Sequence, residues 1–405
     1  MKRFDAETGG EFAAGDGGAD EHLLDDAARL VAKVAAQFAD DVDRSARFPT
    51  EAVDTMREHL LLGAMVPKDL GGRGASLAAV ASACRIIGHA CSSAAMIYAM
   101  HQIQVACVVE HALSDGWHRL FLKQLTQREW LLASATSEEE VGGNLRNSRC
   151  AIEAQQGAFT LQKLAPTISY GAHADAILAT ARRDAAAPPA EQVIVTLLKE
   201  DITLTRRSGW DTFGMRGTCS EGFALDARGQ LGQLFPVPFA AVAEQTMVPT
   251  SHILWAAVWT GIAEDAFRRA HQFFRAQTQK AGSALPPSAR RIADALALLQ
   301  AMEARIDGAL RLHANCTSRT WSASMAHAAE LNTLKTYVSA TALEVVSHAM
   351  MICGMASYKN GTPYTLGRHL RDLHSAPLMI SNDRIEANTA NLLLALRPAS
   401  LERDS

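Results

Sequence analysis

The segment Met351-Ile-Cys-Gly-Met-Ala-Ser-Tyr358, with Leu366-Gly-Arg-His-Leu-Arg-Asp372 a few residues later, says most about the fold of this chain. Long stretches with helical periodicity come before it, at about 244–281, 286–320 and 322–354. A loop broken by glycine and proline at 354–363 then leads into a last helical region that ends near Leu396. Because successive long helices pack side by side, the pattern predicts an antiparallel bundle over residues 240–405.

The first part of the chain is also helical by its periodicity. Residues 1–20 are rich in Gly, Asp and Glu and are expected to form a flexible leader, and residues 21–128 are expected to form an N-terminal α-helical domain. Within it, Thr50 is a candidate N-cap for a helix that runs to Leu62, and Ser76 is a candidate N-cap for the helix after it.

The pattern changes in the middle of the chain, over residues 129–239. Short runs that favour strands, such as Ala176–Thr180 and Val193–Leu198, alternate there with Gly, Asp and Pro. The sequence therefore predicts a mainly α protein with a central β domain between two helical domains.

Composition excludes several classes of protein. The 405 residues carry a formal charge of -4, which gives no positive field for a nucleic acid. The seven cysteines are scattered without a C-x-x-C pair, and the histidines lack metal-site spacing, so neither a disulfide framework nor a metal site is expected. No window reaches about 18 uncharged apolar residues, and the chain is expected to be cytoplasmic and free of the membrane.

Several segments in the same order resemble motifs of the acyl-CoA dehydrogenase family. The order of these matches along the chain is harder to obtain by chance than any one of them. They are Gly63-Ala-Met-Val-Pro-Lys-Asp-Leu-Gly-Gly-Arg-Gly74, Leu132-Ala-Ser-Ala-Thr-Ser-Glu-Glu-Glu-Val-Gly-Gly-Asn144, Thr167-Ile-Ser-Tyr-Gly-Ala-His-Ala-Asp175, Trp210-Asp-Thr-Phe-Gly-Met-Arg-Gly-Thr218 and the C-terminal segment quoted above. The resemblance implies an N-terminal α domain, a β-barrel-like middle domain and a C-terminal four-helix bundle.

The resemblance also implies a cofactor, a substrate and partners. These are FAD, an acyl thioester on coenzyme A or an acyl carrier protein, an electron-transfer flavoprotein as acceptor, and a homo-oligomer, dimer or tetramer. The residues that it places on the flavin are Thr136, Ser137, Thr167, Ser169, Arg275, Gly354 and Met355. It places Gly143 and Ser251 near the substrate, and Arg384 is a further candidate, for a polar or anionic group of the substrate or for a surface ion pair.

The sequence departs from the family at the catalytic base. The family's dehydrogenases remove an α proton with a carboxylate while the flavin accepts the β hydride. One usual position of that carboxylate falls on Ile380-Ser381 and the other on Ser251, so Asp383 and Glu386 are the remaining candidates. This leaves open a dehydrogenase, a monooxygenase of the same fold that needs no carboxylate base, and a partner subunit that has lost the cofactor.

Overall fold

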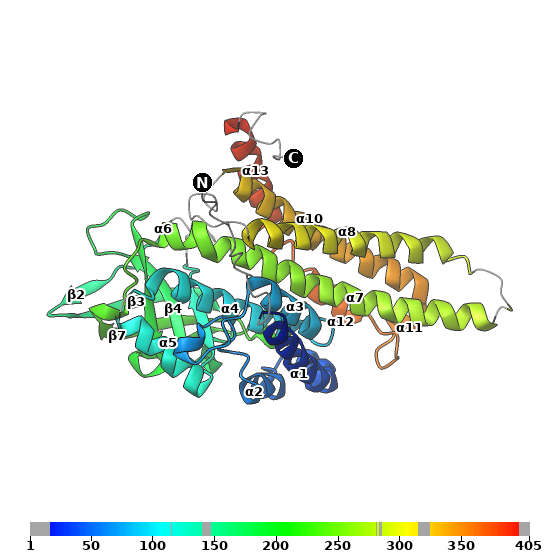
Figure 1. Cartoon of the computed structure of the whole chain (residues 1–405), viewed down its shortest axis with the longest axis horizontal. Coiled ribbons are helices and arrows are strands. Elements are labelled where there is room, and N and C mark those ends of the chain that lie inside the picture. Colours follow the sequence, from blue (N-terminus) through cyan, green and yellow to red (C-terminus); the bar gives the residue numbers. More distant parts are fainter. Residues whose placement is uncertain are drawn as a thin grey trace, which may run out of the picture.

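The computed structural model describes residues 17–114, 116–139, 147–280, 282, 286–314 and 325–396. Strands gather at one end of the elongated molecule and the long helices extend from there to the other end (Figure 1). The arrangement confirms the predicted order of helices, strands and helices. The leader was predicted over residues 1–20. Residues 1–16 lie outside the described part of the chain, and the prediction is wrong for Gly17–Asp20, which belong to the first helix.

The N-terminal helices enclose a shared apolar core. They are α1 (Gly17–Ser45), α2 (Thr50–Glu58), the 3-10 turn η1 (Lys68–Leu70), α3 (Leu77–Gly88), α4 (Ser92–Ala112) and α5 (Gly116–Arg128). The predicted cap at Ser76 is confirmed, because its side chain accepts a hydrogen bond from Ala79 N at 3.1 Å. The prediction for Thr50 is wrong: Pro49 precedes the helix without a side-chain cap, and the helix ends at Glu58 because Leu60 turns into a left-handed conformation.

The middle of the chain forms two sheets. The strands are β1 (Leu132–Ala135), β2 (Glu153–Gln155), β3 (Ala158–Ile168), β4 (Ala176–Arg182), β5 (Gln192–Leu198), β6 (Ile202–Ser208) and β7 (Glu221–Gln230). One sheet has the order β1-β4-β5, with β1 parallel to β4, and the other has the antiparallel order β2-β3-β7-β6. Both strands predicted from the sequence lie inside β4 and β5.

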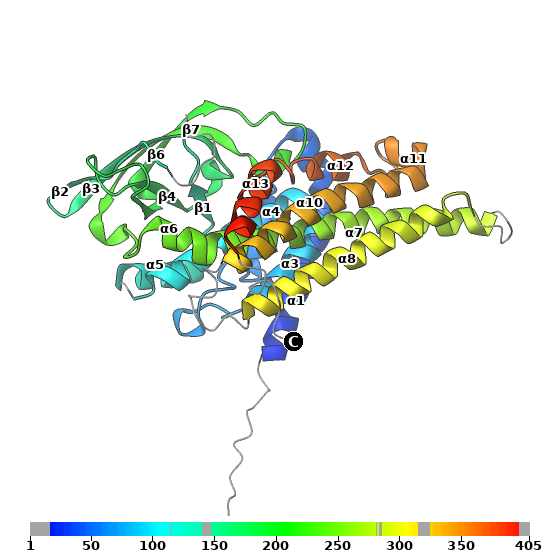
Figure 2. The same ribbon diagram turned by 90° about the horizontal axis from the view of Figure 1, so that it is seen from above.

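The C-terminal helices form the predicted bundle. It comprises α6 (Phe239–Val242), a π-helical turn (Ala243–Met247), α7 (Val248–Lys280), α8 (Ala289–Ala314), α10 (Met325–Cys353), α11 (Met355–Tyr358), α12 (Gly367–Leu373) and α13 (Asn382–Ala395). Viewed from above, α7, α8 and α10 run along one another and α13 lies near the strands (Figure 2).

A close crossing of α3 and α7 joins the N-terminal helices to the bundle. A Cβ atom on Gly261 would lie 2.2 Å from the carbonyl oxygen of Arg85, and one on Gly88 would lie 2.8 Å from that of Val258. Only glycine permits two backbones to approach so closely.

Two helices, α4 and α10, are long and apolar enough to cross a membrane by composition alone. The most apolar part of α4 is 89% buried inside the fold, so its composition is that of a core helix.

Candidate functional site

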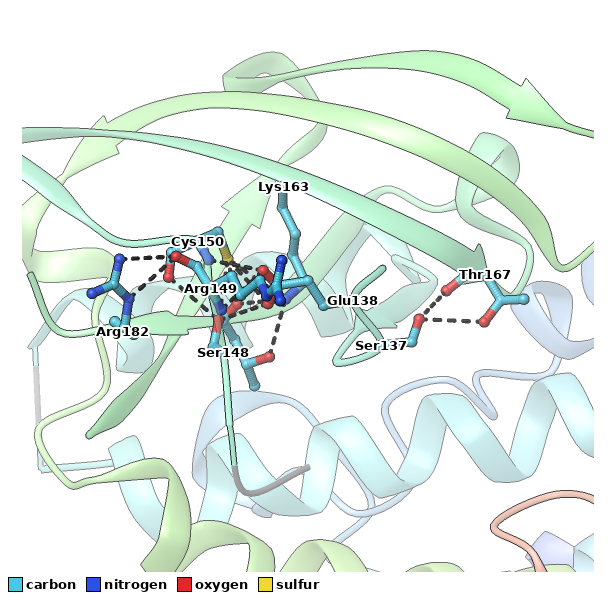
Figure 3. A network of polar contacts seen from close by, with 9 residues as sticks. Ser137, Glu138, Ser148, Arg149, Cys150, Lys163, Thr167 and Arg182 are labelled. Atoms are coloured by element: carbon cyan, nitrogen blue, oxygen red, sulfur yellow. Dashed lines mark hydrogen bonds and ion pairs between the residues drawn. The ribbon is translucent and has the colours of Figure 1, made fainter. Parts of the chain in front are cut away.

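Hydroxyl side chains gather where β1 and β3 end. Ser137 follows β1, and its Oγ donates a hydrogen bond to the carbonyl oxygen of Thr167 at 2.8 Å and lies 3.3 Å from Thr167 Oγ1. Thr167 lies near the end of β3, and Figure 3 shows the two side chains facing each other. Thr136 stands beside them and is partly exposed. Three of the residues predicted to contact a flavin are therefore neighbours.

A second group of hydroxyls, mostly buried, follows the end of β3. Ser169 Oγ lies 2.8 Å from Ser220 Oγ, which lies 2.9 Å from Thr218 Oγ1. Thr218 in turn donates to the carbonyl oxygen of Met215 at 2.9 Å. The sequence singled out Ser169 but gave no indication of Ser220. Ser220 directly precedes β7, and the pairing of β7 with β3 brings it next to Ser169.

A buried ion pair supports the segment that carries Ser137. Lys163, on β3, is fully buried, and its Nζ lies 3.3 Å from Glu138 Oε2 and donates to the carbonyl oxygen of Thr180 at 2.9 Å (Figure 3). Glu138 also accepts from Ser148 Oγ at 2.7 Å and from the backbone N–H of Cys150 at 2.8 Å. The carboxylate thus fixes the chain on both sides of residues 140–146.

Electrostatics keeps Glu138 ionised. Burial alone would raise the pKa of its carboxyl, but the Lys163 ammonium and the hydrogen bond from Ser148 outweigh that effect and hold the pKa below the usual value. The ion pair was missed in the sequence because Glu138 and Lys163 are 25 residues apart, and no motif links them. The available signal was a lysine within the inward-facing pattern of a strand.

The other predicted flavin contacts lie at the far end of the bundle. Arg275 is exposed near the end of α7, and Gly354 lies between α10 and α11 with a positive φ of 55°. Met355 begins α11 and is 64% exposed. Figure 1 shows α11 and the strands at opposite ends of the molecule, so one chain does not bring the two sets of predicted contacts together.

The positions of the family's base hold no carboxylate. Ser251 is buried in α7 and donates to the carbonyl oxygen of Met247 at 2.6 Å. Ile380 and Ser381 form the turn before α13 and are partly exposed. Ile380 has a φ of 47°, which is a strained backbone for a β-branched residue. Neither position can therefore supply a general base of the family's usual kind.

The alternative candidates lie on the surface of α13. The side chains of Asp383, Glu386 and Arg384 are all exposed in the first turns of that helix. The charge of Glu386 partly opposes the lowering, by burial, of the pKa of Lys335, a lysine of α10. The predicted substrate residue Gly143 lies outside the described residues.

Lys335 occupies the space beside the Ile380 turn. Its side chain is fully buried, and its Nζ donates to the carbonyl oxygen of Ile380 at 2.9 Å and to Asn382 Oδ1 at 2.7 Å. The ammonium lies 5.7 Å from the centre of the Trp259 ring. Burial lowers its pKa to about 8, against the opposing charge of Glu386.

Indole rings fill the neighbouring part of α7. Trp255 and Trp259 are 7% and 0% exposed, and their rings are 6.4 Å apart. Their Nε1 donors are buried without a hydrogen-bond partner among the described residues. The two indoles therefore pack in the core of the bundle. No cluster of metal-binding side chains occurs within the described ranges.

Comparison with known proteins identifies the family. Residues 19–129 match the family described as "Acyl-CoA dehydrogenase, N-terminal domain", and residues 241–380 match "Acyl-CoA dehydrogenase, C-terminal domain". The chain belongs to the acyl-CoA dehydrogenase family. The resemblance found in the sequence is thereby confirmed. The protein has the fold of a family of flavin-dependent oxidoreductases.

Individual proteins similar to this chain include one named as a nitrososynthase and two with FMN bound in their solved structures. The chain is 27% identical over 380 residues to the amino sugar nitrososynthase DnmZ of Streptomyces peucetius, with 89% of each chain covered. The FMN-bound TdsC of Paenibacillus sp. A11-2 has a TM-score of 0.81 at 20% identity, over 93% of this chain and 98% of that one. KijD3 with FMN and dTDP-3-amino-2,3,6-trideoxy-4-keto-3-methyl-D-glucose has a TM-score of 0.78 at 21% identity, over 97% of each.

The donor set of this chain fits a flavin. The exposed hydroxyls of Ser137 and Thr167 offer hydrogen bonds to the polar edge of a flavin ring, and reduced flavin accumulates charge that such fixed dipoles stabilise. The exposed Arg275 guanidinium suits a phosphate group. These groups are common to FMN and FAD, so the predicted FAD is supported only as a flavin.

Proposed function

We propose that this protein is a monooxygenase that uses reduced flavin and oxygen to hydroxylate the nitrogen of an amino sugar. The observation that carries the proposal is the absence of a carboxylate at both positions where the family's dehydrogenases hold one. These positions are Ser251 and Ile380-Ser381 in this chain. Ser251 donates its hydroxyl proton to the backbone of its own helix and cannot accept a substrate proton as a carboxylate would.

The proposed reaction does not need that carboxylate. An amine, oxygen and reduced flavin give a hydroxylamine, water and oxidised flavin, and the bound reduced flavin supplies the activation of oxygen. The part left to this chain is to bind the flavin, to exclude water and to present the amine with its lone pair free. The hydroxyls of Ser137, Thr167 and Ser169 suit the first task.

The comparisons support hydroxylation of an amine over dehydrogenation of an acyl thioester. The nitrososynthase relative is similar over nearly the whole chain, and two solved structures of the same fold contain FMN. FMN as a dissociable cofactor is therefore proposed in place of tightly held FAD. A homo-oligomer is proposed as well, since the two sets of predicted flavin contacts lie at opposite ends of one chain (Figure 1).

Dehydrogenation of an acyl thioester is the second candidate. The observation in its favour is that Glu386 acts electrostatically on Lys335, next to the usual position of the base, so a carboxylate lies within reach of that region. An electron-transfer flavoprotein would then be the acceptor.

Two parallel mixing experiments, one with oxygen and one without, test the two candidates. The protein is mixed with chemically reduced FMN and then with aerated buffer that contains the dTDP-linked amino sugar named above, and the product is analysed by mass spectrometry. A product heavier by one oxygen atom is expected. In the second experiment the protein with oxidised flavin is mixed with an acyl thioester without oxygen. Bleaching of the flavin there, together with no oxygen transfer to the amine in the first experiment, would refute the monooxygenase and establish the dehydrogenase.

A further inference from the structure

The three hydroxyls of Ser169, Ser220 and Thr218 form a chain that runs inward from the candidate flavin site. Ser169 is partly exposed, whereas Ser220 and Thr218 are only 6% and 3% exposed. Ser169 Oγ lies 2.8 Å from Ser220 Oγ, and Ser220 Oγ lies 2.9 Å from Thr218 Oγ1. A ligand therefore meets the first hydroxyl of the chain and neither of the other two.

The inner end of the chain has a fixed acceptor. Thr218 Oγ1 lies 2.9 Å from the carbonyl oxygen of Met215, and a carbonyl oxygen only accepts hydrogen bonds. The single proton of the Thr218 hydroxyl therefore points to Met215. The carbonyl is held in place, because Met215 N donates to Asp372 Oδ1 at 2.7 Å and Trp210 Nε1 donates to the carbonyl oxygen at 3.0 Å.

The direction of the other two protons follows from the first. Two hydroxyl oxygens at these distances need a proton between them, and each hydroxyl has one proton to give. Thr218 has used its proton, so it accepts the proton of Ser220. Ser220 has then used its own, so it accepts the proton of Ser169. Ser169 is left with a lone pair, and no proton, to offer to a ligand.

Ser169 lies on the side of the chain that carries the other candidate flavin contacts. Thr167 is exposed, Ile168 is buried and Ser169 is again partly exposed. Because side chains alternate along an extended chain, the hydroxyls of Thr167 and Ser169 lie on the same side. Thr167 Oγ1 is 3.3 Å from Ser137 Oγ, so Ser169 belongs to the same group of hydroxyls.

We propose that the chain Ser169–Ser220–Thr218 makes the site bind reduced flavin in preference to oxidised flavin. The proposal rests on the proposed function and names the groups that select the reactive form of the cofactor. Reduction changes N5 of the flavin ring from a hydrogen-bond acceptor into an N–H donor. A hydroxyl that only accepts is matched to that N–H and is left unpaired by the oxidised ring. Ser169 is the contact residue, and Ser220 and Thr218 are positioning residues that act through it.

The midpoint potential of bound FMN tests the proposal. It is measured by anaerobic reduction of the protein–FMN complex, and calorimetry gives the dissociation constants of oxidised and reduced FMN separately. Tighter binding of the reduced form raises the potential of bound FMN above that of free FMN. One matched hydrogen bond is expected to give a preference of about tenfold. For a two-electron couple this preference corresponds to about 30 mV.

Variants of Thr218 change the chain at a residue that the ligand does not touch. Thr218→Val keeps the shape and removes the acceptor, so Ser220 can donate to Ser169 and the Ser169 proton becomes free to point to the ligand. The preference for reduced FMN should fall by about tenfold, and the potential by about 30 mV. Thr218→Ser keeps the hydroxyl and should retain both. Ser347→Ala removes an exposed hydroxyl that donates to a backbone carbonyl of α10 and is the matched control.

Ser220→Ala provides a second test that does not depend on the fold of Thr218→Val. It also frees the Ser169 proton and should lower the preference, and circular dichroism of each variant shows whether the fold is intact. A chain with a merely structural role would weaken both redox forms equally. An unchanged potential in the folded variants therefore overturns the proposal. Failure of the wild type to bind FMN in either redox state overturns the proposed function and, with it, this inference.

Discussion

Replacement of Lys163 by methionine is expected to destabilise the protein strongly, because it leaves the Glu138 carboxylate buried without its cation. Lys163 is fully buried and the Glu138 side chain is only 7% exposed, so solvent cannot replace the lost partner. Removal of one member of a buried pair costs about 3–5 kcal/mol. Loss of the neighbouring support should also weaken the flavin binding that is proposed at Ser137.

The double variant Lys163→Met, Glu138→Gln gives the sharper measurement. Both charges are then gone, and the loss should be smaller than the sum of the single losses by more than about 1 kcal/mol, because residues in one network are coupled. Urea unfolding followed by circular dichroism measures the four free energies of the cycle. If the double variant lost as much free energy of unfolding as the two single variants together, the two residues would not be coupled and the reasoning would be refuted.

An exposed ion pair in the same domain provides the control. Arg183 and Glu191 are 3.2 Å apart, with side chains 64% and 51% exposed. Arg183→Met should change the free energy of unfolding by no more than about 1 kcal/mol. A loss equal to that of Lys163→Met would show that burial is not the cause.

Three further changes test other parts of the fold. Asp265→Asn should flatten the acid limb of a curve of stability against pH. Burial would raise the pKa of this carboxyl, but the contacts with His369 and arginine outweigh burial and hold the pKa well below its usual value, so the carboxylate stabilises the fold at neutral pH and this stabilisation is lost as the pH falls. An unchanged acid limb would contradict this. Ser76→Ala removes a helix cap and should cost about 1 kcal/mol in urea unfolding, with Ser76→Thr nearly neutral. Gly261→Ala places a methyl group against the Arg85 carbonyl and should cost about 1–3 kcal/mol, and a stable variant would mean that α3 and α7 can move apart.

The sequence predicted the architecture because periodicity and punctuation are local properties. The strands around Ala176 and Val193 and the cap at Ser76 depend on residues a few positions apart, and all three are observed. Thr50 was predicted wrongly because Pro49 occupies the N-cap position and Thr50 is already the first residue of the helix.

The site was less predictable because its contacts are distant in sequence. Ser169 meets Ser220 only through the pairing of β3 with β7, and Lys335 meets Ile380 only when α13 folds back onto α10. A lysine at an inward position of an apolar helix was a usable signal at Lys335, since such a residue is rarely buried without a reason. The assignments of Asp383, Glu386 and Arg384 stay predictions.

The distance between the two sets of predicted flavin contacts has a consequence for genetics. In a homo-oligomer that combines the strands of one subunit with the far end of another subunit's bundle, each cofactor depends on two copies of the gene product. A subunit altered at Ser137 and one altered at Arg275 would each be inactive alone. When the two are expressed together, mixed assemblies contain some sites with neither change, so two defective alleles would complement each other within one cell.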